Sequence, residues 1–293
     1  MNGCDGMTPT SLPGKVETLN GVPIYYEVHG NGEPVLLLHG FSGCSQDWTA
    51  VLGTEALTAG GGFQLIIPDL RGHGRSYVPQ TDHAASTKGE RPHSASSGQA
   101  GEAVPHEIPP WRHDVATEDM IALLDYLGIQ AIKGIGISGG GNVLLHMATK
   151  QPERVKAMVL VSATSYFPAQ ARPLMRAYAE HLPAAERENL RQRHPGGDAQ
   201  IDALLASTKA FADSYDDLNF TPPYLGKITA RTMIVQGDRD PLYPVEISVE
   251  MAKAIPRSSL WILPNAGHGP VLGKGWGEFL KTAGAFLREE EKN

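Results

Sequence analysis

One serine in this sequence stands in a setting that suits a nucleophile. Ser138 lies within the pattern Gly136-Ile137-Ser138-Gly139-Gly140, which follows an apolar run and precedes a stretch with helical character. This order predicts a strand, a sharp turn and a helix, with the serine at the turn and small residues beside it. The free N–H groups of the helix N-terminus would then point at the atom that the serine attacks. By itself the pattern also fits a glycine-rich turn or a phosphate loop.

A serine hydroxyl becomes a useful nucleophile when a base accepts its proton and a carboxylate orients that base. Asp240 and His268 each follow a short apolar run that is typical of a buried strand. Because the C-terminal ends of parallel strands meet at one edge of a sheet, Ser138, Asp240 and His268 are expected to come together there. Asp238 lies in the same turn as Asp240 and is the alternative carboxylate.

Short apolar runs that alternate with helical patterns indicate the scaffold that must position these residues. Continuous apolar runs suit strands buried on both faces of a parallel sheet, and the alternation indicates βαβ units. Asn20-Gly21 favours a tight turn between two antiparallel strands at the start of the sheet. The prediction is an α/β fold with a mostly parallel eight-stranded sheet flanked by helices. The expected strands are 16–19, 22–28, 34–38, 63–69, 132–137, 155–162, 231–236 and 259–263.

The chain is expected to divide into a core and a helical insertion. Residues 1–14, rich in Gly, Thr, Ser and Pro, are expected to be disordered. The strand–helix alternation stops over 164–223, where three helical patterns predict a small cap inserted after the sixth strand. Ordinary helices covering the sheet are the alternative. The core then comprises 15–163 and 224–293, with a flexible insertion at about 77–110 that has almost no large aliphatic residues.

The composition is that of a soluble globular protein, with 41% hydrophobic and 19% charged residues among 293. A formal net charge of -7 and a pI of about 5.9 argue against nucleic acid or an anionic membrane as the main partner. The N-terminus lacks a secretory signal pattern, and no apolar run approaches transmembrane length. Cys4 and Cys44 lack metal-ligand spacing, so no metal site is expected. We expect a cytoplasmic protein, as a monomer or homodimer.

Taken together, the motifs resemble those of the α/β-hydrolase fold family, in its capped branch of serine esterases and lactonases. The resemblance covers about residues 16 to 287, and its motifs are specific for the fold but weak for the substrate. It implies that Ser138 is the nucleophile, His268 the general base and Asp240, rather than Asp238, the carboxylate. The matching motifs are His39-Gly40-Phe41, Asp69-Leu70-Arg71-Gly72-His73-Gly74-Arg75-Ser76, Gly136-Ile137-Ser138-Gly139-Gly140, Gly237-Asp238-Arg239-Asp240 and Gly267-His268.

The resemblance also implies which groups bind the substrate. The backbone N–H groups of Phe41 and Gly139 match the positions of the family's oxyanion hole. The side chains of Phe41, Tyr166 and Tyr243 are the expected substrate-binding residues, with a place in the hydrophobic core as the alternative reading of the two tyrosines.

Other polar positions receive structural interpretations. His39 is expected to hold the oxyanion loop, and His146 is expected to be a core or groove histidine. The position after the nucleophile often holds a larger apolar residue in the family, whereas here Gly139 begins a run of three glycines. Two consequences are open, a wider acyl pocket beside the serine or a looser start to the following helix.

The expected activity is cleavage of carboxylic esters of small to medium acyl groups through an acyl-enzyme, with no cofactor required. The expected partner is a small-molecule ester. On the same triad, a lactonase, a carbon–carbon-bond hydrolase, a cofactor-free perhydrolase and an acyltransferase are alternatives. Outside enzymes, the alternative is a ligand-binding protein that has kept the fold, and turnover would discriminate between them.

Overall fold

The computed structural model describes residues 14–52, 55–58, 62–77 and 111–289. The predicted disordered N-terminus and the predicted flexible insertion therefore lie, apart from their last and first residues, outside the described residues.

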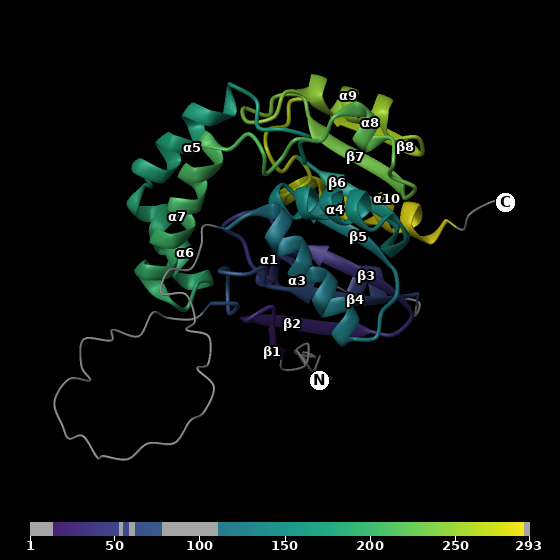
Figure 1. The fold of residues 1–293 in the computed structure, drawn as a ribbon, viewed down its shortest axis with the longest axis horizontal. Coiled ribbons are helices and arrows are strands. Elements are labelled where there is room, and N and C mark those ends of the chain that lie inside the picture. The colour runs from purple at the N-terminus through teal and green to yellow at the C-terminus, as the bar shows by residue number, and fades with distance from the viewer. Residues whose placement is uncertain (1–13, 53–54, 59–61, 78–110, 290–293) are drawn as a thin grey trace, which may run out of the picture.

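An eight-stranded sheet forms the centre of the molecule (Figure 1). The strand order is β1-β2-β4-β3-β5-β6-β7-β8, and only the β1–β2 and β2–β4 pairs are antiparallel. This sheet and its flanking helices confirm the predicted fold class. The strands are β1 (Lys15–Leu19), β2 (Val22–Gly30), β3 (Glu33–Leu38), β4 (Phe63–Pro68), β5 (Ile132–Ile137), β6 (Val155–Val161), β7 (Arg231–Gly237) and β8 (Ser258–Leu263).

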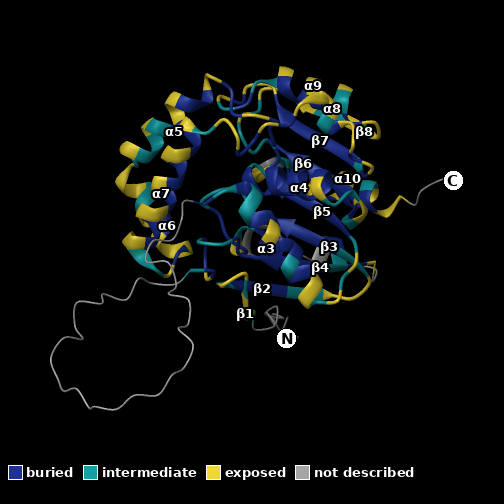
Figure 2. Ribbon diagram, viewed as in Figure 1, coloured by how far each residue is buried: buried dark blue, intermediate teal, exposed yellow. Residues whose placement is uncertain are grey.

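The antiparallel start of the sheet follows from its turn residues. Asn20 and Gly21 have φ angles of 49° and 77°, so both central residues of the β1–β2 turn take the positive values that a tight hairpin requires. The central strands are buried on both faces, as their continuous apolar runs predict (Figure 2).

Helices cover both faces of the sheet and form two hydrophobic clusters. Alternate residues of β3 divide between them, since Leu36 and Leu38 face one cluster while Val35 and Leu37 face the other. The first cluster includes α3 (His113–Tyr126), α4 (Gly139–Lys150), α8 (Pro222–Leu225) and α9 (Val245–Ala254), and the second includes α1 (Gln46–Leu52), α2 (Glu55–Thr58) and α10 (Trp276–Arg288). Two 3-10 turns, Pro152–Arg154 and Gly273–Gly275, complete the regular structure among the described residues.

Three of the four helices between β6 and β7 stand beside the sheet, at the left of Figure 1. They are α5 (Ala171–Glu180), α6 (Ala184–Arg193) and α7 (Gly197–Asp213), and α7 packs against both α5 and α6. Where the chain leaves and re-enters the sheet domain, Tyr166 and Asn219 form an antiparallel bridge. These helices lie within the helical segment predicted over 164–223, while its separation as a cap domain stays a prediction.

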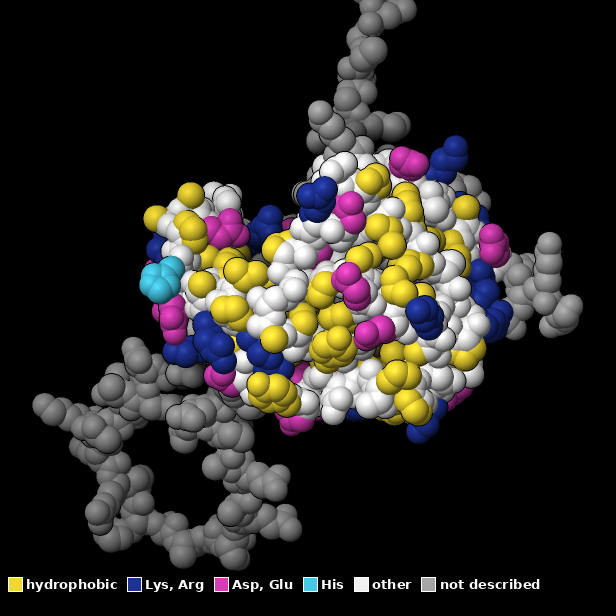
Figure 3. All heavy atoms as spheres, turned by 90° about the horizontal axis from the view of Figure 1, so that it is seen from above, with side chains coloured by type: hydrophobic (Ala, Val, Ile, Leu, Met, Phe, Trp, Pro, Cys, Tyr) yellow, Lys and Arg dark blue, Asp and Glu magenta, His cyan; other side chains and the backbone are white. Residues whose placement is uncertain are grey.

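The surface mixes charges of both signs. On the face drawn in Figure 3, lysine and arginine side chains are interspersed with aspartate and glutamate, and hydrophobic side chains lie among them. None of the described helices is long and apolar enough to cross a membrane.

The sheet and α4 approach each other so closely that a methyl group between them is not accommodated. An ideal Cβ on Gly136 would lie 2.5 Å from both the carbonyl carbon and the carbonyl oxygen of Gly140. We expect Gly136→Ala to lower the free energy of unfolding by about 1–3 kcal/mol, the usual cost of overpacking. Urea unfolding measures this change.

The matched control is Gly277→Ala in α10, where the added Cβ meets no atom within 4 Å. That substitution should raise the free energy of unfolding by about 0.5–1 kcal/mol, because alanine is the better helix former. Equal stability of the Gly136→Ala variant and the wild type would show that the close approach of β5 and α4 does not exclude a side chain at position 136.

Candidate active site

Ser138 stands at the sharp turn between β5 and α4. Its φ and ψ angles are 51° and -117°, a conformation that is rare for any residue other than glycine. Its backbone N–H donates a hydrogen bond to the carbonyl oxygen of Val161 at 2.7 Å, which ties the turn to the end of β6. On the other side, an ideal Cβ on Gly140 would lie 2.4 Å from the carbonyl oxygen of Leu38. The serine is therefore held between the ends of β3 and β6.

The structure brings Ser138, His268 and Asp240 together in one hydrogen-bonded row. Ser138 Oγ lies 2.9 Å from His268 Nε2, and His268 Nδ1 lies 2.8 Å from Asp240 Oδ2. Because an ionised carboxylate only accepts hydrogen bonds, Nδ1–H donates to Asp240 and Nε2 is left to accept from the serine hydroxyl. This arrangement suits proton transfer from the serine to the histidine.

Asp240 is a buried carboxylate with a full set of donors. Its Oδ1 accepts the N–H groups of Leu242 at 2.8 Å and Tyr243 at 3.1 Å, and its Oδ2 also accepts from Gln236 Nε2 at 2.9 Å. Burial raises the pKa of Asp240, but the hydrogen bond and charge of His268 and these backbone donors outweigh it, so the pKa lies below its usual value. Asp240 therefore stays ionised at neutral pH.

Asp238, the alternative carboxylate, has a different position. Its Oδ1 accepts the N–H of Ala266 at 3.3 Å, and the N–H of Arg239 donates to the Ala266 carbonyl at 2.9 Å. Asp238 thus ties the turn after β7 to the loop that leads to His268.

The backbone N–H groups of Phe41 and Gly139 lie near each other beside the serine. An ideal Cβ on Gly139 would be 3.2 Å from the Phe41 nitrogen and 3.6 Å from His113 Nε2. Gly139 is the first residue of α4, so its N–H has no partner within the helix. Of the two consequences considered for Gly139, a wider pocket at this atom is not observed, because Phe41 and His113 lie where a side chain would stand, while a looser helix start stays a prediction.

The loop that presents Phe41 is held by His39. The His39 Nδ1–H donates to the Gly40 carbonyl at 2.7 Å, and His39 Nε2 accepts the N–H of Leu70 at 3.0 Å. Burial lowers the pKa of His39, which keeps the imidazole neutral and its Nε2 available as an acceptor. This is the structural place predicted for His39.

The Phe41 side chain lies in an aromatic cluster that reaches the helical segment. Its ring packs edge-on against His73 at 4.9 Å, Trp111 at 5.3 Å and Phe211 of α7 at 5.0 Å between centroids. The loop that contains Phe41 and α7 are therefore in direct contact. Trp111 Nε1 and His73 Nε2 are buried here without a hydrogen-bond partner.

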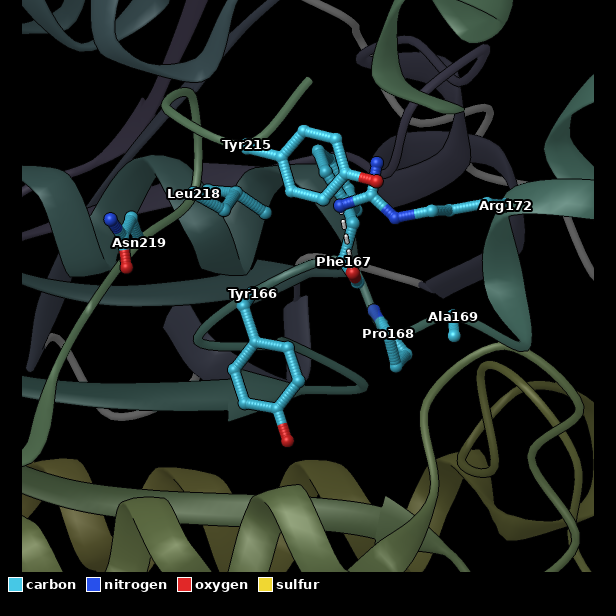
Figure 4. Close-up of a pocket in the computed structure, with 8 residues that line it drawn as sticks. All are labelled: Tyr166, Phe167, Pro168, Ala169, Arg172, Tyr215, Leu218 and Asn219. Atoms are coloured by element: carbon cyan, nitrogen blue, oxygen red, sulfur yellow. Dashed lines mark hydrogen bonds between the residues drawn. The ribbon is translucent and has the colours of Figure 1, made fainter. Parts of the chain in front are cut away.

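The two tyrosines predicted to bind substrate occupy different surroundings. Tyr243 is 4% exposed, and its ring meets the His268 ring edge-on at 5.3 Å between centroids. Tyr166 is 40% exposed and lines a cavity of about 320 Å³ at the base of the helical segment (Figure 4). The cavity is lined by Tyr166, Phe167, Pro168, Ala169, Arg172, Tyr215, Leu218 and Asn219.

Arg172 lines this cavity and contacts several of its other residues. Its guanidinium lies 3.9 Å from the centre of the Tyr215 ring and donates to the Phe167 carbonyl at 3.1 Å. It also donates to the carbonyls of Ala212 and Ser214 at the end of α7, both at 2.8 Å. The cavity wall and the helical segment are therefore joined by one buried cation.

Several polar residues near the site have no motif in the sequence. His113, Asn142 and Asp217 form a buried hydrogen-bonded group beside Gly139. Gln236, which holds Asp240, was also missed. His113 and Asp217 are 104 residues apart, so no spacing could link them. The only signal for Gln236 is that a polar residue directly follows the apolar run Met233-Ile234-Val235 at the end of β7.

The site as a whole contains a serine, a histidine hydrogen-bonded to a buried carboxylate, and two backbone N–H groups near the serine. These are the groups needed for acyl transfer through a tetrahedral intermediate. Within the described ranges, no group of three His, Cys, Asp or Glu residues is placed to hold a metal ion.

The family model described as "alpha/beta hydrolase fold" matches residues 33–196, which is more than half of the chain. The chain belongs to the α/β-hydrolase fold family. The curated relatives include hydrolases of different kinds and also a non-heme haloperoxidase, so membership in this family supports a hydrolase but leaves the substrate open.

Two curated proteins and one solved structure illustrate this range. "Putative carbamate hydrolase RutD" of Variovorax paradoxus is 30% identical over 84% of this chain and 90% of its own length. The 2-hydroxymuconate semialdehyde hydrolase of Pseudomonas putida is 26% identical over 82% of each chain. A thermophilic esterase from Thermogutta terrifontis has a TM-score of 0.66 at 22% identity, covering 94% of this chain and 98% of that one. The last likeness concerns the fold alone.

His146 makes the stability of the protein depend on pH. Its Nε2 hydrogen-bonds the Asp217 carbonyl at 2.8 Å, its ring lies 4.7 Å from that of Phe220, and burial lowers its pKa from 6.5 to about 4. The unfolded chain therefore binds this proton at a higher pH than the folded chain does. Stability is unaffected above about pH 6.5 and is lost as the pH falls toward 4.

We expect His146→Asn to reduce the acid slope of stability by up to about 1.4 kcal/mol per pH unit, the value for one proton. Urea unfolding between about pH 7 and about pH 4.5 measures the slope. Other buried histidines with lowered pKa, such as His39 and His73, keep their contribution, so the slope should diminish rather than vanish. Identical slopes for the variant and the wild type would contradict this expectation.

Proposed function

We propose that this protein is a serine hydrolase that cleaves carboxylic esters of small to medium acyl groups through an acyl-enzyme intermediate. The observation that supports it most strongly is the unbroken hydrogen-bonded row from Ser138 through His268 to Asp240. Family membership adds support for hydrolysis, and the ester substrate is our own inference.

In the acylation step, Ser138 Oγ attacks the ester carbonyl carbon while His268 Nε2 accepts the serine proton. Asp240 keeps the imidazole in the correct tautomer and stabilises the imidazolium that forms. The N–H groups of Phe41 and Gly139 donate to the oxyanion of the tetrahedral intermediate. The intermediate then collapses, the C–O bond to the alcohol breaks, and His268 returns its proton to the leaving alcohol.

In the deacylation step, the same groups act on water. His268 accepts a proton from a water molecule, which attacks the acyl carbon and forms a second oxyanion beside Phe41 and Gly139. Collapse releases the carboxylic acid, and the proton on His268 returns to Ser138. His268 is therefore the protein group that accepts and returns the proton in both steps.

The surroundings of the serine support a substrate of limited size. The aromatic cluster around Phe41 fills the space next to the oxyanion loop, which leaves little room there for a long chain. The cavity of about 320 Å³ beside Tyr166, whose lining includes neither Ser138 nor His268, is at the small end of ligand-binding cavities. We propose Phe41 and Tyr166 as substrate contacts. We propose that Tyr243 affects substrate binding indirectly, because its ring packs against the ring of His268.

A second candidate is hydrolysis of a carbamate on the same groups. The 30% identity to the carbamate hydrolase relative favours it, because attack on a carbamate carbonyl uses the same nucleophile and the same oxyanion donors. Lactones, carbon–carbon bonds and peracid formation remain further alternatives for this triad, as the sequence predicts.

The decisive comparison is between the wild type and Ser138→Ala on p-nitrophenyl esters from acetate to laurate. We expect the short acyl chains to be turned over fastest. The variant should lose on the order of 10⁶-fold in kcat, because only oxyanion binding and proximity remain. Ser259→Ala on the exposed side of β8 is the control and should retain wild-type turnover.

A chain-length optimum at laurate would contradict the proposed acyl size. Turnover of a matched carbamate or lactone with no ester hydrolysis would replace the ester assignment while keeping the triad. Ester hydrolysis that persists in Ser138→Ala would exclude Ser138 as the nucleophile.

A further inference from the structure

A second histidine–carboxylate pair lies next to the catalytic groups. His113 begins α3 and Asp217 lies where the helical segment returns to the sheet domain, and their exposed fractions are 2% and 1%. The His113 backbone N–H donates to Asp217 Oδ1 at 3.0 Å, and its Nδ1 lies 2.7 Å from Oδ2. Burial raises the pKa of Asp217, but the hydrogen bond from His113 and the nearby charge of Arg112 are among the effects that outweigh it, so the pKa lies below its usual value.

This pairing determines what the other ring nitrogen of His113 offers. When Nδ1–H donates its hydrogen bond to Asp217 and the ring is neutral, Nε2 carries a lone pair that can accept a hydrogen bond. Asn142 Nδ2 lies 3.4 Å from that nitrogen, and Asn142 Oδ1 accepts the N–H of Thr164 at 2.9 Å. The Thr164 bond orients the amide so that its NH₂ group faces His113 as a donor.

Asn142 connects this pair to the catalytic residues in two ways. Its backbone N–H donates to the Ser138 carbonyl at 3.0 Å in the first turn of α4. Its side chain also lies close enough to the hydroxyl of Tyr243 to interact with it, and the Tyr243 ring meets the ring of His268. A continuous set of buried contacts therefore runs from Asp217 through His113, Asn142 and Tyr243 to His268.

His113 also borders the oxyanion hole. The point where a Cβ of Gly139 would stand is 3.6 Å from His113 Nε2 and 3.2 Å from the Phe41 nitrogen. The imidazole thus takes the space that a side chain after the nucleophile would need. Gly139, the departure from the family pattern, and His113 are complementary in shape.

If His113 and Asp217 served only to link α3 to the helical segment, fewer contacts than those observed would be enough. A buried ion pair is weak evidence for stability, because apolar side chains of similar volume often serve equally well. A tie between α3 and the helical segment would also be complete with the two bonds to Asp217. The remaining nitrogen of His113, the ring atom Nε2, instead faces Asn142 and Gly139 in the first turn of α4.

We propose that His113, oriented by Asp217, is a positioning residue for the Ser138 machinery. It fixes the Asn142 amide, and through Tyr243 it fixes the ring of His268, so that the return of the helical segment to the core sets the catalytic geometry. The inference rests on the proposed function, because it assigns a role in the same acyl-transfer site.

Three variants separate positioning from a structural tie. His113→Gln can keep an acceptor near the Nε2 position but loses the donor to Asp217, whereas His113→Asn keeps that donor and loses the acceptor. Asp217→Asn keeps the shape but favours the other tautomer, which would aim an N–H at the Asn142 NH₂ group. Steady-state kinetics with p-nitrophenyl acetate separates kcat from KM for each variant.

We expect His113→Asn and Asp217→Asn to lower kcat by about tenfold or more with KM changed less than about twofold, since a misplacement of about 1 Å costs up to about 10²-fold. His113→Gln should retain more kcat than His113→Asn. A structural tie predicts the reverse order, because it depends on the bond to Asp217 alone.

The control is His146→Asn, which also removes a buried histidine bonded to Asp217, in this case through the backbone carbonyl. It should alter stability and leave kcat at the wild-type value. The rate at which a fluorophosphonate labels Ser138 gives a second readout that does not depend on ester preference, and it should fall in parallel with kcat.

Each outcome then has one meaning. Wild-type kcat and labelling in both His113→Asn and Asp217→Asn, or a higher kcat in His113→Asn than in His113→Gln, overturns the positioning role and leaves the proposed function standing. Wild-type protein that neither hydrolyses esters nor reacts with the fluorophosphonate overturns the proposed function, and the positioning role fails with it. The expected order with unchanged KM supports both.

Discussion

The unusual backbone conformation of Ser138 is the constraint on which the rest of the site depends. A φ of 51° at a residue with a side chain costs on the order of 1–3 kcal/mol and persists only where the surroundings enforce it. Here Gly136 and Gly140 allow the end of β5 and the start of α4 to approach closely, and the bond to Val161 holds the turn. The same turn raises the serine hydroxyl out of the sheet and leaves the Gly139 N–H without a helical partner. One strained turn therefore provides both the nucleophile and a donor for the oxyanion.

The parallel sheet turns this local feature into a site. Ser138, Asp240 and His268 follow β5, β7 and β8, so the ends of three strands bring them within hydrogen-bond reach. Asp240 is buried yet ionised because four groups donate to it, and it can therefore stabilise a positive charge on His268. The oxyanion loop is held from behind by His39 and from the front by the aromatic contacts of Phe41. These contacts reach α7, so the helical segment is packed against the groups that would bind the acyl carbonyl.

Local sequence signals were sufficient for the sheet and for the main groups of the site. Apolar runs predicted all eight strands within a few residues, and Asn20-Gly21 predicted the hairpin, because both features depend on near neighbours in the chain. Ser138, Asp240 and His268 could be found because each directly follows a strand. The His113–Asp217 pair could not be found, since it arises only when the helical segment folds back onto α3. For the same reason, the sequence could not show that the space beside Gly139 is occupied. The imidazole of His113 that lies there comes from a distant part of the chain.

The most direct test of this account is to trap the acyl-enzyme. The wild type would be mixed with p-nitrophenyl acetate, quenched with acid during the first turnover, digested and analysed by mass spectrometry. The account predicts one acetyl group, located on the peptide that contains Ser138, and a burst of p-nitrophenol that matches the amount of labelled protein. Turnover of the ester with no acetyl group on Ser138, or with the label on another residue, would contradict it.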